Sequence, residues 1–191
     1  MRVGIDPGHG GGDTGAAHGG YIERDLVNLA AEILHCYLVA HDVIPVHTRT
    51  AGENPWFITR GARTRSCDAV VSLHVNANDN PAINGLEIYH WPGSVVGKEL
   101  ANLIAVACPS ELRPTDRGVC RIYEAVDSSD KGKVWLQRPR SVMRYHHPPA
   151  VLVELGYITN AANRAYLANG GLDSSCRAIT DALLTNHRNL R

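Results

Sequence analysis

Segments of strand character and segments of helix character alternate along this chain from its first residue. Residues 1–6 form a short apolar run that predicts a buried strand. In the next segment apolar residues recur at intervals of three and four, which is the spacing of an amphipathic helix. The apolar stripe of that helix consists of Leu26, Leu29, Ala30, Ile33, Leu34, Tyr37 and Leu38. Further strands are predicted at 42–48, 68–75, 86–91, 119–123 and 149–155, and further helices at 97–108 and 172–184.

One more helix is predicted between the second and third strands, opened by Asn54 as a cap and Pro55 in the first turn. Such alternation favours an α/β layered architecture. With 191 residues, of which 44% are hydrophobic, the chain is long enough for one core and short for two. We expect a single α/β domain over residues 1–191, with a mostly parallel or mixed twisted sheet of about six strands and helices on both faces.

The composition narrows the function classes. Nineteen basic and nineteen acidic side chains cancel, which disfavours nucleic acid as a partner. No run approaches the ~20 apolar residues that a membrane-spanning helix needs, and the first residues lack the pattern of a secretory signal. We therefore expect a soluble, leaderless chain without membrane insertion. Five widely spaced cysteines, with no Cys-x-x-Cys pair, are expected to be buried reduced thiols: Cys36, Cys67, Cys108, Cys120 and Cys176.

A glycine-rich turn follows the first strand, in Gly4-Ile-Asp-Pro-Gly-His-Gly-Gly-Gly-Asp13. Glycines let the backbone turn sharply, so that His9 can project from a strand end into a cleft. Alone, the turn is equally compatible with a phosphate cradle or a plain loop, and His9 with a solvated loop histidine. A nucleotide site is disfavoured, because the turn lacks a Walker lysine and the Rossmann spacing.

Three more residues lie at positions where functional sites commonly occur in such folds. His74 lies near the end of the third predicted strand, and Glu154 lies in the apolar strand 149–155. Sites in open parallel sheets collect at the carboxyl ends of strands. An ionised carboxylate in so apolar a strand needs a partner. For Glu154 that partner is either a cation bound in an active site or an arginine, Arg49 or Arg63, in a buried salt bridge. Glu23 lies at the start of the long helix, a position where the helix dipole alone is enough to favour a carboxylate.

Together, His9, Glu23 and His74 form a two-histidine, one-carboxylate set, the ligand type that leaves zinc an open fourth position. Zinc lowers the pKa of its bound water from ~15.7 to ~7. Glu154 would then supply the base that takes and returns a proton. Asp6 is a candidate to orient His9 through its second ring nitrogen, although a strand-end cap explains Asp6 nearly as well.

Several polar residues are weaker candidates for contacts with a substrate. Asn76, Asn78 and Asn160 could hydrogen bond a glycan or peptide, or only stabilise turns. Arg63 or Arg144 could receive a carboxylate, or remain solvated. The pair His146-His147 precedes two prolines and is expected in an extended segment near the site. Surface or helix-face positions are expected for His35, His41, His47, His90 and His187.

The surroundings of the four main residues resemble those of the zinc-dependent N-acetylmuramoyl-L-alanine amidases of bacterial cell-wall hydrolysis. The matching stretches are Ile5-Asp-Pro-Gly-His-Gly-Gly11, Glu23, Thr48-Arg49, Asp68, Ser72-Leu-His-Val-Asn-Ala77, Gly85-Leu-Glu-Ile-Tyr89 and Pro149-Ala-Val-Leu-Val-Glu-Leu-Gly-Tyr-Ile-Thr-Asn160. The resemblance spans nearly the whole catalytic domain of that family. It implies that His9, Glu23 and His74 hold one zinc ion and that Glu154 is the catalytic glutamate.

The resemblance also implies a substrate and a setting. The substrate would be bacterial peptidoglycan, cut at the amide between the lactyl group of N-acetylmuramic acid and L-alanine of the stem peptide. The chain would be a bare catalytic domain without a wall-binding unit, as in some endolysins, made in the cytoplasm and acting as a monomer at the wall or in the periplasm, in lysis or wall remodelling. The stretch 119–148 is longer than the family pattern. A zinc peptidase cutting within the stem peptide and a noncatalytic wall-binding module are the alternatives.

Overall fold

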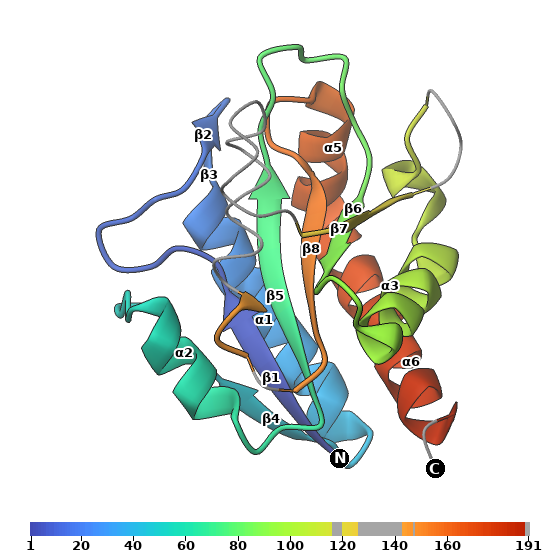
Figure 1. Ribbon diagram of the computed structural model, residues 1–191. Helices are drawn as coiled ribbons and strands as arrows, with labels where there is room; N and C mark the ends of the chain where they lie inside the picture. Colours follow the sequence, from blue (N-terminus) through green and yellow to red (C-terminus); the bar gives the residue numbers. More distant parts are fainter. Residues whose placement is uncertain (116–119, 126–142, 147, 190–191) are drawn as a thin grey trace.

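A computed structural model describes residues 1–115, 120–125, 143–146 and 148–189 (Figure 1). Its main sheet has six strands in the order β4-β1-β5-β8-β6-β7. All neighbouring pairs are parallel except β6 and β8, which run antiparallel. The strands are β1 (Arg2–Pro7), β4 (Ile44–His47), β5 (Ala69–Asn76), β6 (Glu87–His90), β7 (Arg121–Glu124) and β8 (Ala150–Tyr157). The expected single α/β domain with a mixed six-stranded sheet is confirmed.

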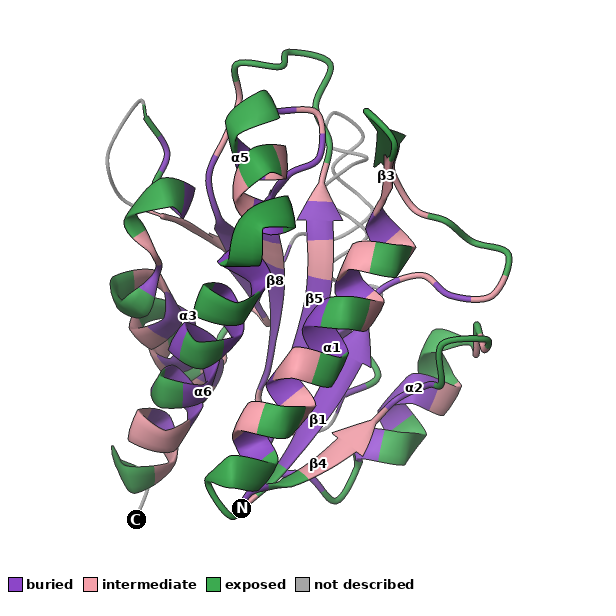
Figure 2. Ribbon diagram, turned by 180° about the vertical axis from the view of Figure 1, so that it is seen from behind, coloured by how far each residue is buried: buried purple, intermediate pink, exposed green. Residues whose placement is uncertain are grey.

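The helices among the described residues cover both faces of this sheet. Their bounds are α1 (Glu23–Ala40), α2 (Phe57–Thr64), α3 (Val95–Ala107), α5 (Ala161–Tyr166) and α6 (Leu172–Asn189). Helices α1, α3 and α6 lie together on one face, with α1 and α3 both packed against α6, whereas α2 lies on the other face (Figures 1 and 2). A short hairpin of β2 (Ala17–His18) and β3 (Tyr21–Ile22) precedes α1. No helix in the described part of the chain is long and apolar enough to cross a membrane.

Alternation of side chains along the central strands separates two cores. Val71 and Leu73 of β5 belong to the larger core, which they share with the inward stripe of α1. Val70 of β5 belongs to the smaller core on the face of α2. Because neighbouring residues of a strand point to opposite faces, His74 falls on the same face as Val70. Both faces of β5 are thus buried, as expected for a central strand flanked by helices.

The parallel register places three strand ends side by side. Strand β5 lies between β1 and β8, and His74 pairs with Glu154 across β5 and β8. The carboxyl ends of β1, β5 and β8 therefore share one edge of the sheet, where sites collect in α/β folds. The turn that carries His9 follows β1 at the same edge (Figure 1).

Some local expectations are wrong, for identifiable reasons. Helix α2 begins at Phe57, its N-cap Trp56 makes no side-chain cap bond, and Asn54 instead accepts a hydrogen bond from Arg60. Leu29 follows the apolar spacing of α1 but is 54% exposed, because it lies on the side of the helix opposite the buried residues Val27, Leu34 and Leu38.

Other expectations about burial are also corrected. His90 is not a surface residue, because it lies within β6, where it is buried. The cysteines are all free, as expected, but only Cys67, Cys108 and Cys176 are buried. Cys36 is exposed because it falls on the outer side of α1, and Cys120 is half-buried beside the edge strand β7.

Substituting Leu34 with alanine tests the packing of α1. Leu34 is fully buried in the larger core, so Leu34→Ala should lower the free energy of unfolding by about 2–5 kcal/mol through lost burial and a residual cavity. The matched control, Leu29→Ala on the exposed side of the same helix, should change it by about 0.5 kcal/mol or less. Urea unfolding followed by circular dichroism measures both. Equal losses in the two variants would contradict the placement of Leu29 outside the core.

Candidate active site

His9, Glu23 and His74 meet at the carboxyl edge of the sheet. They come from the turn after β1, from the first residue of α1 and from β5. One ligand atom of each residue lies within 4.8 Å of the others. His9 Nε2 is 3.0 Å from Glu23 Oε2, and His74 Nδ1 is 3.0 Å from Glu23 Oε1. The structure thus brings together the three residues predicted as metal ligands.

Two glycines allow this close approach. A side chain at Gly8 would overlap the ring of His74, and one at Gly15 would lie 2.5 Å from Glu23 Oε2 and 2.6 Å from His9 Cδ2. His9 itself has a φ of 59°, in the left-handed region that non-glycine residues rarely adopt. The glycine-rich stretch is therefore needed for the contact between the ligands as well as for the turn.

The Glu23 carboxylate is held from four sides. Besides the two histidines, the amide of Ala16 donates to Oε2 at 2.9 Å and the amide of Val75 donates to Oε1 at 3.1 Å. Burial alone would raise the pKa of Glu23, but the hydrogen bonds to His74 and His9 outweigh it and hold the pKa well below its usual range. The carboxylate is therefore ionised at neutral pH and faces two imidazoles.

Asp13, rather than Asp6, orients the His9 ring. His9 Nδ1 lies 3.1 Å from Asp13 Oδ2, and the other oxygen of Asp13 accepts from the amide of Gly15 at 3.0 Å. Burial lowers the pKa of His9, but its contacts with Glu23 and Asp13 raise it overall. The prediction that Asp6 holds His9 is therefore wrong, because Asp6 points to the face of the sheet covered by α2, where other partners occupy its oxygens. The signal for Asp13 was a carboxylate four residues after His9 within the same turn.

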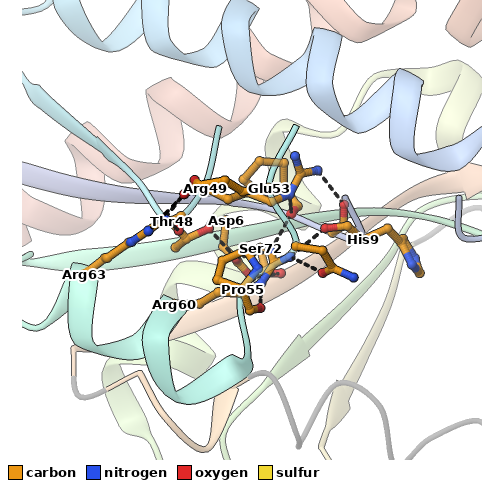
Figure 3. Close-up of polar contacts among 12 residues, drawn as sticks. Asp6, His9, Thr48, Arg49, Glu53, Pro55, Arg60, Arg63 and Ser72 are labelled. Atoms are coloured by element: carbon orange, nitrogen blue, oxygen red, sulfur yellow. Dashed lines mark hydrogen bonds and ion pairs between the residues drawn. The ribbon is translucent and has the colours of Figure 1, made fainter. Parts of the chain in front are cut away.

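Asp6 is the centre of a buried polar cluster beneath the site (Figure 3). Its oxygens accept from Thr48 Oγ1 at 2.6 Å, from Ser72 Oγ at 2.7 Å and from Arg60 Nη1 at 2.9 Å. His146 Nε2 lies 3.8 Å away. Burial would raise the pKa of Asp6, but His146, Arg60 and Thr48 together hold it well below the ordinary value of 3.8.

Glu154 has the opposite electrostatic character. Its Oε2 atom is buried and has no hydrogen-bond partner among the described residues. Burial and the neighbouring negative charges of Glu23 and Glu87 raise its pKa well above the usual range. Glu87 is its cross-strand neighbour on β6, a proximity that the sequence did not reveal.

The salt bridges considered for Glu154 are not formed by the described residues. Arg49 donates to the main-chain oxygens of Pro7 and Gly8, and Arg63 pairs with Glu53 at 3.0 Å. Within the part of the chain that the structure describes, Glu154 therefore has a buried carboxyl oxygen without a hydrogen bond, and its raised pKa marks it as a candidate functional group.

The three-residue cluster fits a zinc ion. Zinc bonds of ~2.0–2.1 Å to nitrogen and oxygen at tetrahedral angles place neighbouring ligand atoms ~3.3 Å apart, close to the 3.0 Å separations seen here. His74 also has a buried Nε2 without a hydrogen-bond partner in the described chain. Two imidazoles and a carboxylate are the donor set of catalytic zinc, and Asp13 supplies the acceptor that a metal-bound histidine requires.

The predicted substrate residues have different settings. Asn76 ends β5 and donates to Glu87 Oε2 at 3.0 Å. Asn160 is buried, with its oxygen accepting from the Asn163 amide to cap α5 and its nitrogen donating to Pro81 O. Arg144 is exposed.

Of the remaining candidates, Asn78 accepts from the backbone amide of Asn80, which is a turn contact. His146 lies beneath the site rather than in it, with its Nδ1 2.8 Å from Thr64 Oγ1. His147, and most of the stretch 119–148, fall outside the described residues.

The fold and the site define an α/β domain with a candidate hydrolytic metal centre at the carboxyl edge of its sheet. Residues 3–185 match the family of N-acetylmuramoyl-L-alanine amidases, and the chain belongs to that family. The resemblance inferred from its motifs is confirmed.

Relatives and solved structures agree with this assignment. The amidase LytC of Bacillus subtilis strain 168 is 30% identical over 194 residues, covering 96% of this chain and 35% of LytC. This chain thus spans about a third of the length of that relative. The structure of the amidase AmiC2 of Nostoc punctiforme superposes with a TM-score of 0.79 at 29% identity, covering 98% of this chain and 97% of that one. An amidase from Clostridium difficile 630 gives a TM-score of 0.82 at 27% identity, with 98% and 96% covered.

Substituting Asp6 with asparagine tests the buried cluster. Asp6→Asn leaves the Arg60 guanidinium buried without its carboxylate, so unfolding should become easier by about 3 kcal/mol at pH 7. The folded pKa of Asp6 lies below its unfolded value, so its stabilisation is present above about pH 4 and is lost as the pH falls. The difference between wild type and variant should therefore begin to shrink as the pH falls below about 5 and continue to shrink below roughly pH 3 in denaturant titrations.

The control for this experiment is Glu53→Gln, which removes the carboxylate of an exposed pair and should have little effect. A deficit in Asp6→Asn that stays constant across this pH range would show that Asp6 does not act through its charge.

Proposed function

We propose that this chain is a zinc-dependent catalytic domain that hydrolyses the amide between the lactyl group of N-acetylmuramic acid and L-alanine of the stem peptide. The observation that carries the proposal is the clustering of His9, Glu23 and His74 beside the carboxyl group of Glu154, whose buried Oε2 has no hydrogen-bond partner among the described residues, within an amidase-family fold. Bacterial peptidoglycan is then its partner and the cell wall is its place of action. We propose that residues 1–191 work as one domain and as a monomer.

His9, Glu23 and His74 would hold the zinc ion. When bound, zinc would lower the pKa of a coordinated water and polarise the carbonyl of the substrate. The chain's own part is to present two imidazoles and one carboxylate in a fixed arrangement. Backbone amides of Ala16 and Val75 fix the carboxylate, and Asp13 fixes the His9 ring.

Glu154 is proposed to move the proton. It would accept a proton from the attacking water at a carboxylate oxygen and deliver it to the nitrogen of the departing L-alanine amine. A raised pKa suits this task, because the group must both take and release a proton near neutral pH. Burial and the adjacent carboxylates of Glu23 and Glu87 supply that property.

Substrate contacts are proposed for three residues whose positions in the structure differ. Arg144 is exposed and suited to a carboxylate of the stem peptide. Asn76 has a side chain at the end of β5, next to the strand pair of His74 and Glu154. Asn160 would act through the backbone that it holds, since its amide is already bonded to Asn163 and Pro81.

Digestion of purified sacculi with the zinc-loaded protein tests the proposed bond. Mass spectrometry should find glycan strands without peptides, together with intact stem peptides that begin with a free L-alanine amine. Peptide fragments cut inside the stem would instead identify a peptidase. Binding to sacculi without release of new amino groups would identify a noncatalytic wall-binding module.

Substituting Glu154 with glutamine tests the proton transfer. Glu154→Gln keeps the size of the side chain but cannot accept a proton, so kcat should fall by about 10²- to 10⁴-fold while zinc content stays stoichiometric. Elemental analysis and release of amino groups from sacculi measure the two quantities.

The matched variant is His74→Ala, which removes a proposed ligand and should lose both zinc and turnover. A Glu154→Gln enzyme with full turnover would exclude Glu154 as the base. Stoichiometric zinc in purified His74→Ala would exclude His74 as a ligand.

A further inference from the structure

Two buried arginines bind the backbone of the turn that carries His9. Arg49 Nε donates to Pro7 O at 2.9 Å, and Arg49 Nη2 donates to Gly8 O at 2.7 Å. Arg60 Nη1 donates to Pro7 O at 2.7 Å, and Arg60 Nη2 donates to His9 O at 2.5 Å. Three successive carbonyls therefore receive four hydrogen bonds from two guanidinium groups (Figure 3).

This convergence of carbonyls is not a property of ordinary strands. Successive carbonyls of an extended strand point in alternating directions, whereas those of Pro7, Gly8 and His9 all reach the same pair of side chains. The chain must curl for this to occur, and His9 has the left-handed φ of 59° that such a curl requires. A non-glycine residue in that conformation persists only where the surroundings hold it.

The two arginines are themselves anchored. Arg60 Nε donates to Pro55 O at 3.2 Å, Arg60 Nη2 to Asn54 Oδ1 at 3.2 Å, and Arg60 Nη1 to Asp6 at 2.9 Å. Arg49 Nη1 donates to Thr50 O at 3.1 Å. Both side chains are only 3% exposed. The hydrogen bonds thus connect the turn after β1 to the segment before α2 and to α2 itself.

Keeping two like charges buried side by side is costly. Burial and the neighbouring Arg60 lower the pKa of Arg49 to about 10, so Arg49 remains charged at neutral pH. Asp6 is the carboxylate that the structure shows paired with Arg60. Two lysines would carry the same charge, but only the rigid, five-donor guanidinium can bond several carbonyls in one plane. The arrangement therefore depends on the shape of arginine as well as on its charge.

We propose that Arg49 and Arg60 act together as positioning residues for His9, holding the Pro7, Gly8 and His9 carbonyls so that the His9 imidazole faces Glu23 and His74. This inference rests on the proposed function, because His9 matters there as a zinc ligand. Both guanidinium groups act on the main-chain carbonyls of this turn, and within the described chain neither is seen hydrogen bonded to the side chains of His9, Glu23 or His74.

The test measures zinc affinity, not only activity. Arg49→Lys and Arg60→Lys are purified, stripped of metal, checked for folding by circular dichroism, and titrated with zinc against a competing chelator. Each substitution should weaken zinc binding by about 10- to 100-fold, the range seen when residues supporting metal ligands are changed. Visible absorption of the cobalt-substituted proteins should also change, because the geometry around the ion is altered.

Arg164→Lys is the matched control. Arg164 is a partly buried arginine that donates to a main-chain oxygen, Ile158 O at 2.8 Å, away from the His9 turn. Its substitution should leave zinc affinity and the cobalt spectrum unchanged. Arg49→Lys and Arg60→Lys proteins that match wild type in both readouts, even with lower activity, would overturn the proposal.

A milder variant tests the positioning role if the Arg49→Lys and Arg60→Lys proteins fail to fold. Asn54→Ala keeps both arginines and removes one anchor of Arg60 from an exposed position. Weaker zinc binding by Asn54→Ala supports the positioning role, and wild-type affinity overturns it. A wild-type protein that binds no zinc would overturn the proposed function and this inference with it. A wild-type protein that binds zinc, with variants that bind it equally well, would overturn this inference alone.

Discussion

The Glu23 carboxylate is the contact on which the site depends. It receives hydrogen bonds from the backbone of the β2–β3 region and of β5, and it lies against imidazoles from the turn after β1 and from β5. Three parts of the chain, namely the turn after β1, the segment before β2 and strand β5, are thus fixed relative to one side chain. Because Glu23 is the first residue of α1, packing of that helix on the sheet is coupled directly to the geometry of the candidate metal centre.

Two buried glutamates with opposite properties stand in the same site. Glu23 has a lowered pKa because histidines and backbone amides stabilise its charge, while Glu154 has a raised pKa because burial and two other carboxylates oppose its charge. A metal ligand must be ionised, and a group that shuttles a proton must hold it readily. The fold separates these roles by its hydrogen bonds rather than by residue type.

The polar cluster around Asp6 lies beneath this site, on the same face of the sheet as His74. Asp6 connects β1, β5 and α2 through Ser72 and Arg60, and Arg60 continues to the carbonyls of the His9 turn. The buried charges therefore form one network with the catalytic edge. We expect loss of Asp6 to lower stability, whereas the proposed positioning role predicts that loss of the arginine contacts displaces His9.

Much of the fold and of the candidate site could be predicted from the sequence alone. Alternating apolar runs specified the α/β sheet, because period-2 and helical spacings each bury one face, and the residues His9, Glu23, His74 and Glu154 followed from their places at strand and helix ends. The family motifs strengthened this reading, since several separated stretches matched together.

Only the tertiary structure decided which groups touch. Asp13 took the role expected of Asp6, because residues in a strand point to a face set by register, and Asp6 faces α2. Glu87 became the neighbour of Glu154 through antiparallel pairing of β6 with β8. Arg49 and Arg60 reached the His9 turn across more than forty positions in sequence. Such contacts arise from strand order and backbone curvature, which local spacing along a chain does not encode.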